Sequence, residues 1–336
     1  KPLICIGGGV FAAHAENEVR ELADLMQIPV ITTMMGISVF PDDDRLFCGM
    51  IGTHGVKMAN TAVNECDVLF LVGARVGDRA VKTPLALEKT TKIIHIDIDP
   101  AEIGKNIGAD LPLVGDAKLV LQQMAELAKP MKHDEWIAHI KTLGGEREYV
   151  EPAKGTVNPR VFIDRLAKKM PANVTVVADV GQNQIWTCTE YKFRKEGRLL
   201  TSGGMGTMGY SVPAAIGAKM ADDSRATVAI CGDGAFQMSF MELATAVQFG
   251  VDIKVVVMTN NRLGMVRELQ TNGYHDRQTA VFLDGSPDFI KLAEAYGIPA
   301  MRVYDDDTMD KGVEMLAEHK GICLVEVVVD KDMPTL

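Results

Sequence analysis

Two apolar runs in the second half of the chain end in residues that could bind a metal and a phosphate. The run from Thr227 to Cys231 stops at Gly232-Asp233-Gly234, and the run from Ile253 to Met258 stops just before Asn260-Asn261. Carboxylate and amide oxygens are hard donors that suit Mg²⁺ held together with phosphate oxygens. The flanking glycines let the backbone approach a phosphate closely. These residue types therefore predict a site for a magnesium-bound phosphate ligand.

The stretch between the two runs predicts the element that positions them. Its apolar residues fall at the i, i+3, i+4 and i+7 positions of one helical face: Phe240, Leu243, Ala244 and Val247. A strand–helix–strand unit has parallel strands and a right-handed crossover. Asp233 and Asn260 then lie at the carboxyl ends of neighbouring or near-neighbouring strands, where open α/β sheets bind ligands.

Each of these residues alone is commonly an ordinary strand-end aspartate or turn asparagine. Gly-Asp-Gly followed by 25 residues and then Asn-Asn is more specific, and it resembles the cofactor motif of enzymes that depend on thiamine diphosphate (ThDP). The motif therefore points to ThDP and Mg²⁺ as ligands.

Composition limits the classes of function. With 336 residues, of which 47% are hydrophobic and 24% charged, the chain is long enough for two globular domains. A net charge of -10 argues against nucleic acid or an anionic membrane as the main partner. The six cysteines form no C-x-x-C pair, which is typical of buried thiols in a reducing cytoplasm, so we expect a cytoplasmic protein. The chain opens on Lys1-Pro2 and enters a strand at once, so we expect a fragment of a longer protein.

The first predicted strand, Leu3 to Ile6, runs into Gly7-Gly8-Gly9-Val10-Phe11-Ala12 and a helix to about Gln27. This G-x-G-x-x-A pattern is a weak dinucleotide signal. An NAD site needs an acid at the end of the next strand, but that strand ends in Thr33-Met34-Met35. NAD binding is therefore disfavoured, and glycines that only shape a strand–helix junction remain an alternative.

Other predicted strand ends in the first half also carry Gly, Arg and Asp: Gly52 to Gly55, Gly73 to Arg79, Asp97 to Asp99, and Gly115-Asp116. Such loops on one edge of a parallel sheet are a usual way to hold an extended nucleotide. An alternative to ligand binding is that Arg75 and Arg79 form surface salt bridges. Likewise, His54 and His95 are alternatively histidines of the core. Asp116 is a plausible N-cap of the helix that follows.

The predicted fold is α/β, with two doubly wound parallel-sheet domains in tandem. We expect a first α/β domain at 1–130, a linker at 131–158 that contains a helix from Asp134 to Leu143, and a diphosphate-binding domain at 159–336. In the second domain, a strand ends in Asp179 to Gln184, and a glycine-rich segment spans Ser202 to Gly209.

These segments, in this order, resemble the catalytic large subunit of the acetolactate synthase (acetohydroxyacid synthase) family, over nearly the whole chain. The segments that carry the resemblance are Gly52 to Gly55, Gly77 to Arg79, HIDIDPAEIGKN from His95, Gly181 to Trp186, SGGMGTMGYSVPAA from Ser202, and NRLGMV from Asn261.

The resemblance implies the site residues. Asp233, Asn260 and the carbonyl of Arg262 would hold Mg²⁺. The residues lining the diphosphate and thiazolium would be Gln182, Asn183, Gly234, Ala235, Leu263, Gly264 and Met265. Gly206 would bind the aminopyrimidine, Met208 would bend the cofactor, and Arg79 would meet the keto-acid carboxylate. FAD, without a net redox role, would contact Gly7, Gly8, Gly9, Thr33, Met34, Met35, Gly52, His54, Gly55, Arg75, Asp78, Asp97, Ile98, Glu102, Gly115, Asp116 and Gln184.

The implied reaction is decarboxylation of pyruvate and transfer of the remaining two-carbon unit to a second 2-keto acid, giving 2-acetolactate or 2-aceto-2-hydroxybutyrate. The resemblance also implies a homodimer or homotetramer and allows a regulatory small subunit. The glutamate that activates the cofactor lies in the family's N-terminal domain, so we expect this chain alone to be nearly inactive. Leu269 stands where the family usually has Trp, and Asn183 where it has His.

Three alternatives remain open. The first is another ThDP-dependent enzyme, either a decarboxylase or an oxidase with a redox-active flavin. The second is an NAD-dependent dehydrogenase, which is disfavoured because no acid stands at the end of the strand before Thr33. Because the N-terminal domain is missing, a non-catalytic cofactor-binding or regulatory fragment is the third alternative.

Overall fold

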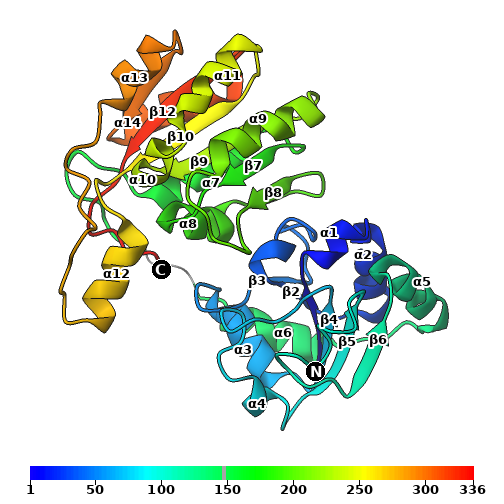
Figure 1. Cartoon of the computed structure of the whole chain (residues 1–336). Helices are drawn as coiled ribbons and strands as arrows, with labels where there is room; N and C mark the ends of the chain where they lie inside the picture. The colour runs from blue at the N-terminus through cyan, green and yellow to red at the C-terminus, as the bar shows by residue number, and fades with distance from the viewer. Residues whose placement is uncertain (146–148) are drawn as a thin grey trace. The chain divides into compact units, whose positions relative to one another are not determined.

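A computed structural model of the chain describes residues 1–145 and 149–336. The chain divides into two compact units, Lys1–Arg147 and Glu148–Leu336 (Figure 1). The predicted domain 1–130 falls within the first unit and 159–336 within the second. Residues 146–148, which belong to the predicted linker, lie outside the described residues.

The first unit is built on a six-stranded parallel sheet in the order β3-β2-β1-β4-β5-β6. Its strands are β1 (Pro2–Ile6), β2 (Val30–Thr32), β3 (Phe47–Met50), β4 (Val68–Val72), β5 (Lys92–Asp97) and β6 (Leu111–Val114). Strand β1 pairs with both β2 and β4, so the chain leaves the centre of the sheet in both directions. Such a switch point opens a crevice at the carboxyl ends of β1 and β4.

Successive side chains of β1 point to opposite faces of the sheet, so the core of this unit has two layers. Leu3 and Cys5 pack on the face covered by α3 (Lys57–Glu65) and α6 (Asp134–Leu143). Ile4 and Ile6 pack on the other face, against α1 (Gly9–Ala12), α2 (Glu16–Met26) and α5 (Ala117–Leu127). The short elements η1 (Met34–Gly36) and α4 (Pro84–Leu87) complete the unit.

Helix α6 has the predicted bounds and belongs to this core. Trp136 and Ile140 are buried, and the indole Nε1 of Trp136 donates to the carbonyl of Pro2 at 2.9 Å. The helix therefore packs with the first unit, although it falls inside the range predicted as a linker.

The prediction of one helix from the glycine turn to Gln27 is wrong. Helix α1 ends at Ala12, and α2 begins only at Glu16. His14, between them, has a φ of +50°, a left-handed conformation that a continuous α-helix does not contain.

The second unit has a six-stranded parallel sheet in the order β11-β12-β10-β9-β7-β8. Its strands are β7 (Thr175–Ala178), β8 (Arg198–Thr201), β9 (Thr227–Gly232), β10 (Lys254–Thr259), β11 (Ala300–Val303) and β12 (Cys323–Val328). Every strand pair in both described sheets is parallel, which confirms the predicted fold class. Strand β7 pairs with both β8 and β9, so the switch point lies between β7 and β9.

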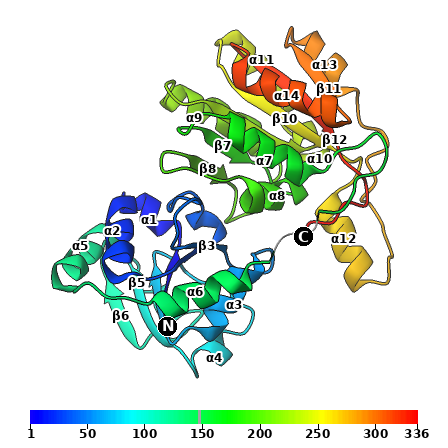
Figure 2. The same cartoon turned by 180° about the vertical axis from the view of Figure 1, so that it is seen from behind.

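Helices cover both faces of the second sheet (Figures 1 and 2). One face carries α9 (Ser211–Ala221), α10 (Asp233–Gln237), α11 (Leu243–Gln248) and α13 (Phe289–Ala295). The view from behind brings forward α7 (Pro159–Lys169), α8 (Gln182–Glu190) and α14 (Asp306–Glu318). Helix α12 (Gly264–Gly273) extends from the carboxyl end of β10, and η2 (Phe240–Glu242) precedes α11.

The predicted apolar helix face after Gly-Asp-Gly is partly wrong. Leu243 is buried, but Ala244 and Val247 are exposed and Ala246 is buried instead. The single predicted helix is in fact α10, a 3₁₀ turn and α11, and the 3₁₀ turn with three residues per turn changes the phase of the pattern. No helix among the described residues is long and apolar enough to cross a membrane.

Candidate functional site

A cavity in the second unit lies at the carboxyl ends of β7, β9 and β10, which is the edge that the switch point predicts. It is lined by Val180, Gly181, Gln182, Asn183, Trp186, Met208, Gly232, Asp233, Gly234, Ala235, Met258, Asn260, Arg262, Leu263, Gly264, Met265 and Val266. All residues predicted to bind ThDP or magnesium line this cavity except Gly206. Gly206 lies in the exposed loop after β8, with a φ of +67°.

Asp233 links the ends of two neighbouring strands. Its side chain is 2% exposed. Its Oδ1 accepts the backbone N–H of Gly234 at 2.8 Å, and its Oδ2 accepts those of Asn260 at 3.1 Å and Asn261 at 2.6 Å. Burial raises the pKa of this carboxyl to about 6, although the three N–H donors oppose that shift. A cation beside Asp233 would replace the lost hydration and favour the carboxylate form.

Asn260 provides the second oxygen at this edge. Its Oδ1 accepts the N–H of Arg262 at 3.1 Å, and its Nδ2 donates to Oε1 of Gln182 at 3.2 Å. The described residues contain no group of three or more His, Cys, Asp and Glu arranged to hold a metal. A cation here would therefore take one carboxylate, an amide or carbonyl oxygen, and the ligand's own phosphate oxygens, which is the donor set Mg²⁺ accepts.

Two helix N-termini also end at the cavity. Helix α8 starts at Gln182 and α12 at Gly264, and neither has a side-chain hydrogen bond at its N-cap. Unsatisfied N–H groups at a helix N-terminus attract an anion. The residues present therefore fit a diphosphate together with Mg²⁺.

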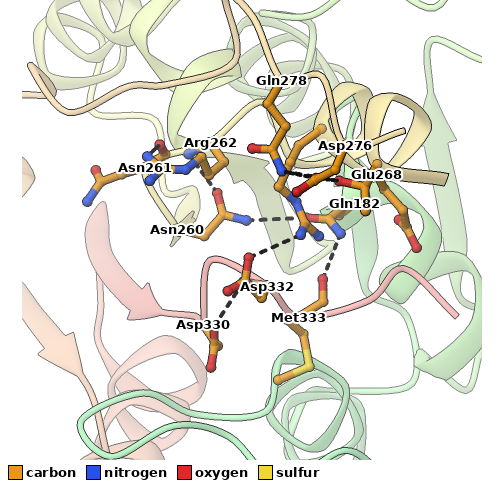
Figure 3. Close-up of polar contacts among 12 residues, drawn as sticks. Gln182, Asn260, Asn261, Arg262, Glu268, Asp276, Gln278, Asp330, Asp332 and Met333 are labelled. Atoms are coloured by element: carbon orange, nitrogen blue, oxygen red, sulfur yellow. Dashed lines mark hydrogen bonds and ion pairs between the residues drawn. The ribbon is translucent and has the colours of Figure 1, made fainter. Parts of the chain in front are cut away.

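Gln182 connects the cavity to the C-terminal segment 330–336 (Figure 3). Its Nε2 donates to the carbonyl of Met333 at 2.9 Å and to Oγ1 of Thr335 at 3.2 Å. A Cβ on Gly264 would lie 1.8 Å from Oε1 of Gln182, so a larger residue at the start of α12 would displace this amide. Nearby, Nε1 of Trp186 donates to the carbonyl of Pro334 at 3.1 Å.

Asn183 holds the floor of the cavity rather than pointing a donor into it. Its Nδ2 donates to the carbonyls of Asp179 at 2.7 Å and Ile230 at 3.2 Å. Both amide hydrogens are thus used between the ends of β7 and β9. Asn183 lines the cavity near the start of α8, so its backbone N–H, rather than its amide, remains as a donor for an anion.

An apolar wall borders the cavity at Gly234. A Cβ on Gly234 would lie 2.8 Å from Cδ2 of Leu263, and 3.2 Å from both Cδ1 of Leu283 and Cε of Met208. These three side chains therefore converge on one glycine and form a surface on which a flat ring can pack.

In the first unit, the predicted flavin residues lie at the carboxyl ends of successive strands. Gly7, Gly8 and Gly9 follow β1; Thr33, Met34 and Met35 follow β2; Gly52, His54 and Gly55 follow β3; Arg75, Asp78 and Arg79 follow β4; Asp97, Ile98 and Glu102 lie at or beyond the end of β5; and Gly115 and Asp116 follow β6. Gln184 lies in the second unit, where its Nε2 donates to Oγ1 of Thr201 at 2.6 Å.

Close backbone packing explains why glycines follow β1. A Cβ on Gly7 would lie 2.1 Å from the carbonyl oxygen of Gly73, and one on Gly9 would lie 2.7 Å from the Cα of Gly73. The loops after β1 and β4 therefore touch backbone to backbone across the crevice. This contact accounts for Gly7 and Gly9 without a ligand, so the G-x-G-x-x-A pattern alone does not identify a nucleotide.

The surrounding side chains nevertheless fit an extended, polar ligand along this edge. Buried Oε2 of Glu102 and both ring nitrogens of His95 have no hydrogen-bond partner among the described residues. His95 is 1% exposed and burial lowers its pKa, which agrees with the alternative of a core histidine. Arg75 and Arg79 are exposed, and within the described chain neither forms an ion pair.

The structure tests the predicted N-cap at Asp116 and shows where Leu269 lies. Asp116 caps α5, because its Oδ1 accepts the N–H groups of Lys118 at 2.9 Å and Leu119 at 3.2 Å, which confirms the predicted N-cap. Leu269 lies on α12 and is 64% exposed.

The sequence did not reveal the role of Asp179, although it stands at the end of a predicted strand. Asp179 is fully buried, and its carboxylate accepts N–H groups from Gly209 and Ser211. Those partners are about thirty residues away in sequence, so only the fold brings them together. The contribution of the segment 330–336 to the cavity was missed for the same reason.

Comparisons with known proteins place both units. Residues 1–124 match the family model described as thiamine pyrophosphate enzyme, central domain, and residues 179–327 match thiamine pyrophosphate enzyme, C-terminal TPP binding domain. The chain is 40% identical over 341 residues to a probable acetolactate synthase large subunit of Methanocaldococcus jannaschii, with 98% of the chain and 58% of that protein covered.

Two bacterial relatives give similar figures. The chain is 36% identical to the acetolactate synthase large subunit of Lactococcus lactis, with 98% of the chain and 58% of that protein covered. It is 40% identical to an acetolactate synthase of Mycobacterium avium, with 92% of the chain and 52% of that protein covered. The chain therefore spans somewhat more than half the length of these relatives.

Proposed function

The chain belongs to the thiamine pyrophosphate enzyme family, and we propose on that basis that the protein it represents is an acetolactate synthase. The relatives that cover nearly the whole chain carry that name. The single observation that supports it best is the cavity at the β7/β9 switch point, where Asp233, Asn260 and two helix N-termini meet.

In this proposal, Mg²⁺ is held by the Asp233 carboxylate, the Asn260 amide oxygen and the Arg262 carbonyl. The free N–H groups at the starts of α8 and α12 bind the diphosphate. Bound ThDP supplies the carbanion chemistry. Met208, Leu263 and Met265 exclude water from the reacting end and fix the orientation of the ring.

The first unit is proposed to hold FAD along the carboxyl ends of β1, β4 and β5. The switch point between β1 and β4 supports this assignment, as does Oε2 of Glu102, which is buried and has no hydrogen-bond partner among the described residues. The Arg79 guanidinium would meet the keto-acid carboxylate, because it is exposed and makes no ion pair in the described chain.

Pyruvate and a second 2-keto acid are the proposed substrates. We propose a homodimer or homotetramer as the assembly, in the cytoplasm. Because relatives are named large subunits, a small regulatory subunit is a further proposed partner.

The test uses the full-length protein, supplied with pyruvate, ThDP, Mg²⁺ and FAD, with products identified by mass spectrometry. We expect acetolactate that requires both ThDP and Mg²⁺ and disappears in Asp233→Ala. Acetaldehyde or acetate as the main product would instead identify a decarboxylase or an oxidase. An unchanged pyruvate pool would contradict any enzymatic role for the cavity.

A further inference from the structure

The loop from Ser202 to Tyr210 carries two residues of the proposed cofactor site, Gly206 and Met208. It leaves the end of β8 and turns tightly, since the N–H of Gly206 donates to the carbonyl of Ser202 at 3.0 Å and the N–H of Thr207 to Oγ of Ser202 at 3.1 Å. Gly206 and Gly209 both have positive φ, of +67° and +83°. Short turns of this kind fix the shape of a loop but not its position on the sheet.

A carboxylate from the neighbouring strand fixes that position. Asp179 follows directly after β7 and is 0% exposed. Its Oδ1 accepts the N–H of Val180 at 2.9 Å and that of Gly209 at 3.0 Å, and its Oδ2 accepts the N–H of Ser211 at 2.7 Å. One buried side chain thus holds the end of the loop by two charge-assisted hydrogen bonds.

The same carboxylate caps a helix from another part of the chain. Ser211 is the first residue of α9, and the N-cap residue Tyr210 has no side-chain cap hydrogen bond. Asp179 supplies the missing acceptor, and its negative charge lies at the positive end of the helix dipole. The carbonyl of Asp179 also accepts Nδ2 of Asn183, so Asp179 contacts the floor of the cavity as well as the loop.

Met208 is the group whose position depends on this anchor. It lies one residue before Gly209, and its Cε would come within 3.2 Å of a Cβ on Gly234, against the apolar wall of the cavity. A displacement of Gly209 would therefore move Met208 relative to Leu263 and Leu283, while Asp233, Asn260 and the helix N-termini stay in place.

We propose that Asp179 is a positioning residue that sets the place of Met208 in the cavity by holding Gly209 and Ser211. The inference rests on the proposed function only in taking ThDP as the ligand of this cavity. It predicts that Asp179 contributes to binding of the ring portion of the cofactor and not to binding of its diphosphate.

The test is Asp179→Asn in the full-length protein, with affinities measured by isothermal titration calorimetry in the presence of Mg²⁺. The new amide must place a donor against the N–H of Gly209 or Ser211, so at least one hydrogen bond is lost. We expect affinity for ThDP to fall about tenfold or more, the size expected for one lost bond to a charged group. Affinity for inorganic pyrophosphate should stay within about twofold, because its ligands are untouched.

Asp305→Asn is the matched control. Asp305 caps α14 in the same unit, accepts the N–H of Thr308 at 2.8 Å, and is not among the residues that line the cavity. It should change neither affinity. An Asp179→Asn protein that binds both ligands normally, or loses both equally, would overturn the positioning role, because the second result is what a general structural defect produces.

Hydrogen exchange tests the anchor independently of any ligand. In the wild-type protein, the amides of Gly209 and Ser211 should exchange more slowly than the exposed amide of Met205 in the same loop. Equal exchange rates at these positions would refute the anchor, even if Asp179→Asn failed to fold. A wild-type protein that binds pyrophosphate but not ThDP would refute the proposed cofactor instead and leave the exchange result as the test of the anchor.

Discussion

Gly264→Ala should destabilise the second unit, because the added methyl group would displace the buried amide of Gln182. Its Cβ would lie 1.8 Å from Oε1 and 2.6 Å from Cδ of Gln182. The Gln182 amide would have to move and give up its hydrogen bonds to Asn260, Met333 and Thr335. Three lost bonds cost about 1.5–4.5 kcal/mol. The better helix propensity of alanine returns about 1 kcal/mol, so we expect a net loss of about 0.5–3.5 kcal/mol.

Urea denaturation measures this loss, because each unit contains one tryptophan. In a Trp136→Phe background, Trp186 is the sole indole and reports unfolding of the second unit. Gly273→Ala is the matched control on the same helix, since a Cβ there meets nothing within 4 Å. We expect Gly273→Ala to be neutral or slightly stabilising. A Gly264→Ala protein as stable as the Gly273→Ala protein would refute the packing of Gln182 against α12.

Two further predictions concern stability. Because burial raises the folded-state pKa of Asp233 from 3.8 to about 6, the folded apoprotein binds more protons than the unfolded chain, and its stability should fall by about 2 kcal/mol as pH rises from 4 to 6. Asp233→Asn should remove this component, and equal pH slopes of the free energy of unfolding in variant and wild type would contradict it. Gly7→Ala should destabilise the first unit by about 2 kcal/mol or more, since its Cβ would meet the carbonyl of Gly73, whereas Gly77→Ala has open space and should be neutral. Thermal unfolding followed by Trp136 fluorescence in a Trp186→Phe background compares the stability of the two variants.

Much of the fold follows from local pattern. Buried parallel strands appear as short β-branched runs, and α7 begins at Pro159 because Asn158 caps it and proline suits the first helical position. The errors occur where local signals compete. His14 breaks a helix without a glycine or proline, and the 3₁₀ turn at Phe240 shifts the apolar phase in a way that a 3.6-residue period cannot register.

The sequence was sufficient to predict the site residues that stand directly after strands. Asp233 and Asn260 stand at the ends of paired strands, so the βαβ rule brings them together. Asp179 and Met333 could not be assigned in this way, since their partners come from loops that only tertiary packing brings near. The glycines after β1 show that one sequence pattern can have two causes. A close backbone contact with Gly73 and a nucleotide site both require glycine, so the pattern alone does not distinguish them.

The central claim is that the cavity at the β7/β9 switch point holds the cofactor diphosphate through Mg²⁺ on Asp233 and Asn260. The most direct measurement is calorimetric titration of ThDP into the full-length protein with and without Mg²⁺, for the wild type and Asp233→Asn. The account predicts binding that requires Mg²⁺ and weakens at least about 100-fold in the variant, which is the effect of losing a charged ligand worth about 3 kcal/mol. Binding that needs no Mg²⁺, or that is equal in the two proteins, would contradict it.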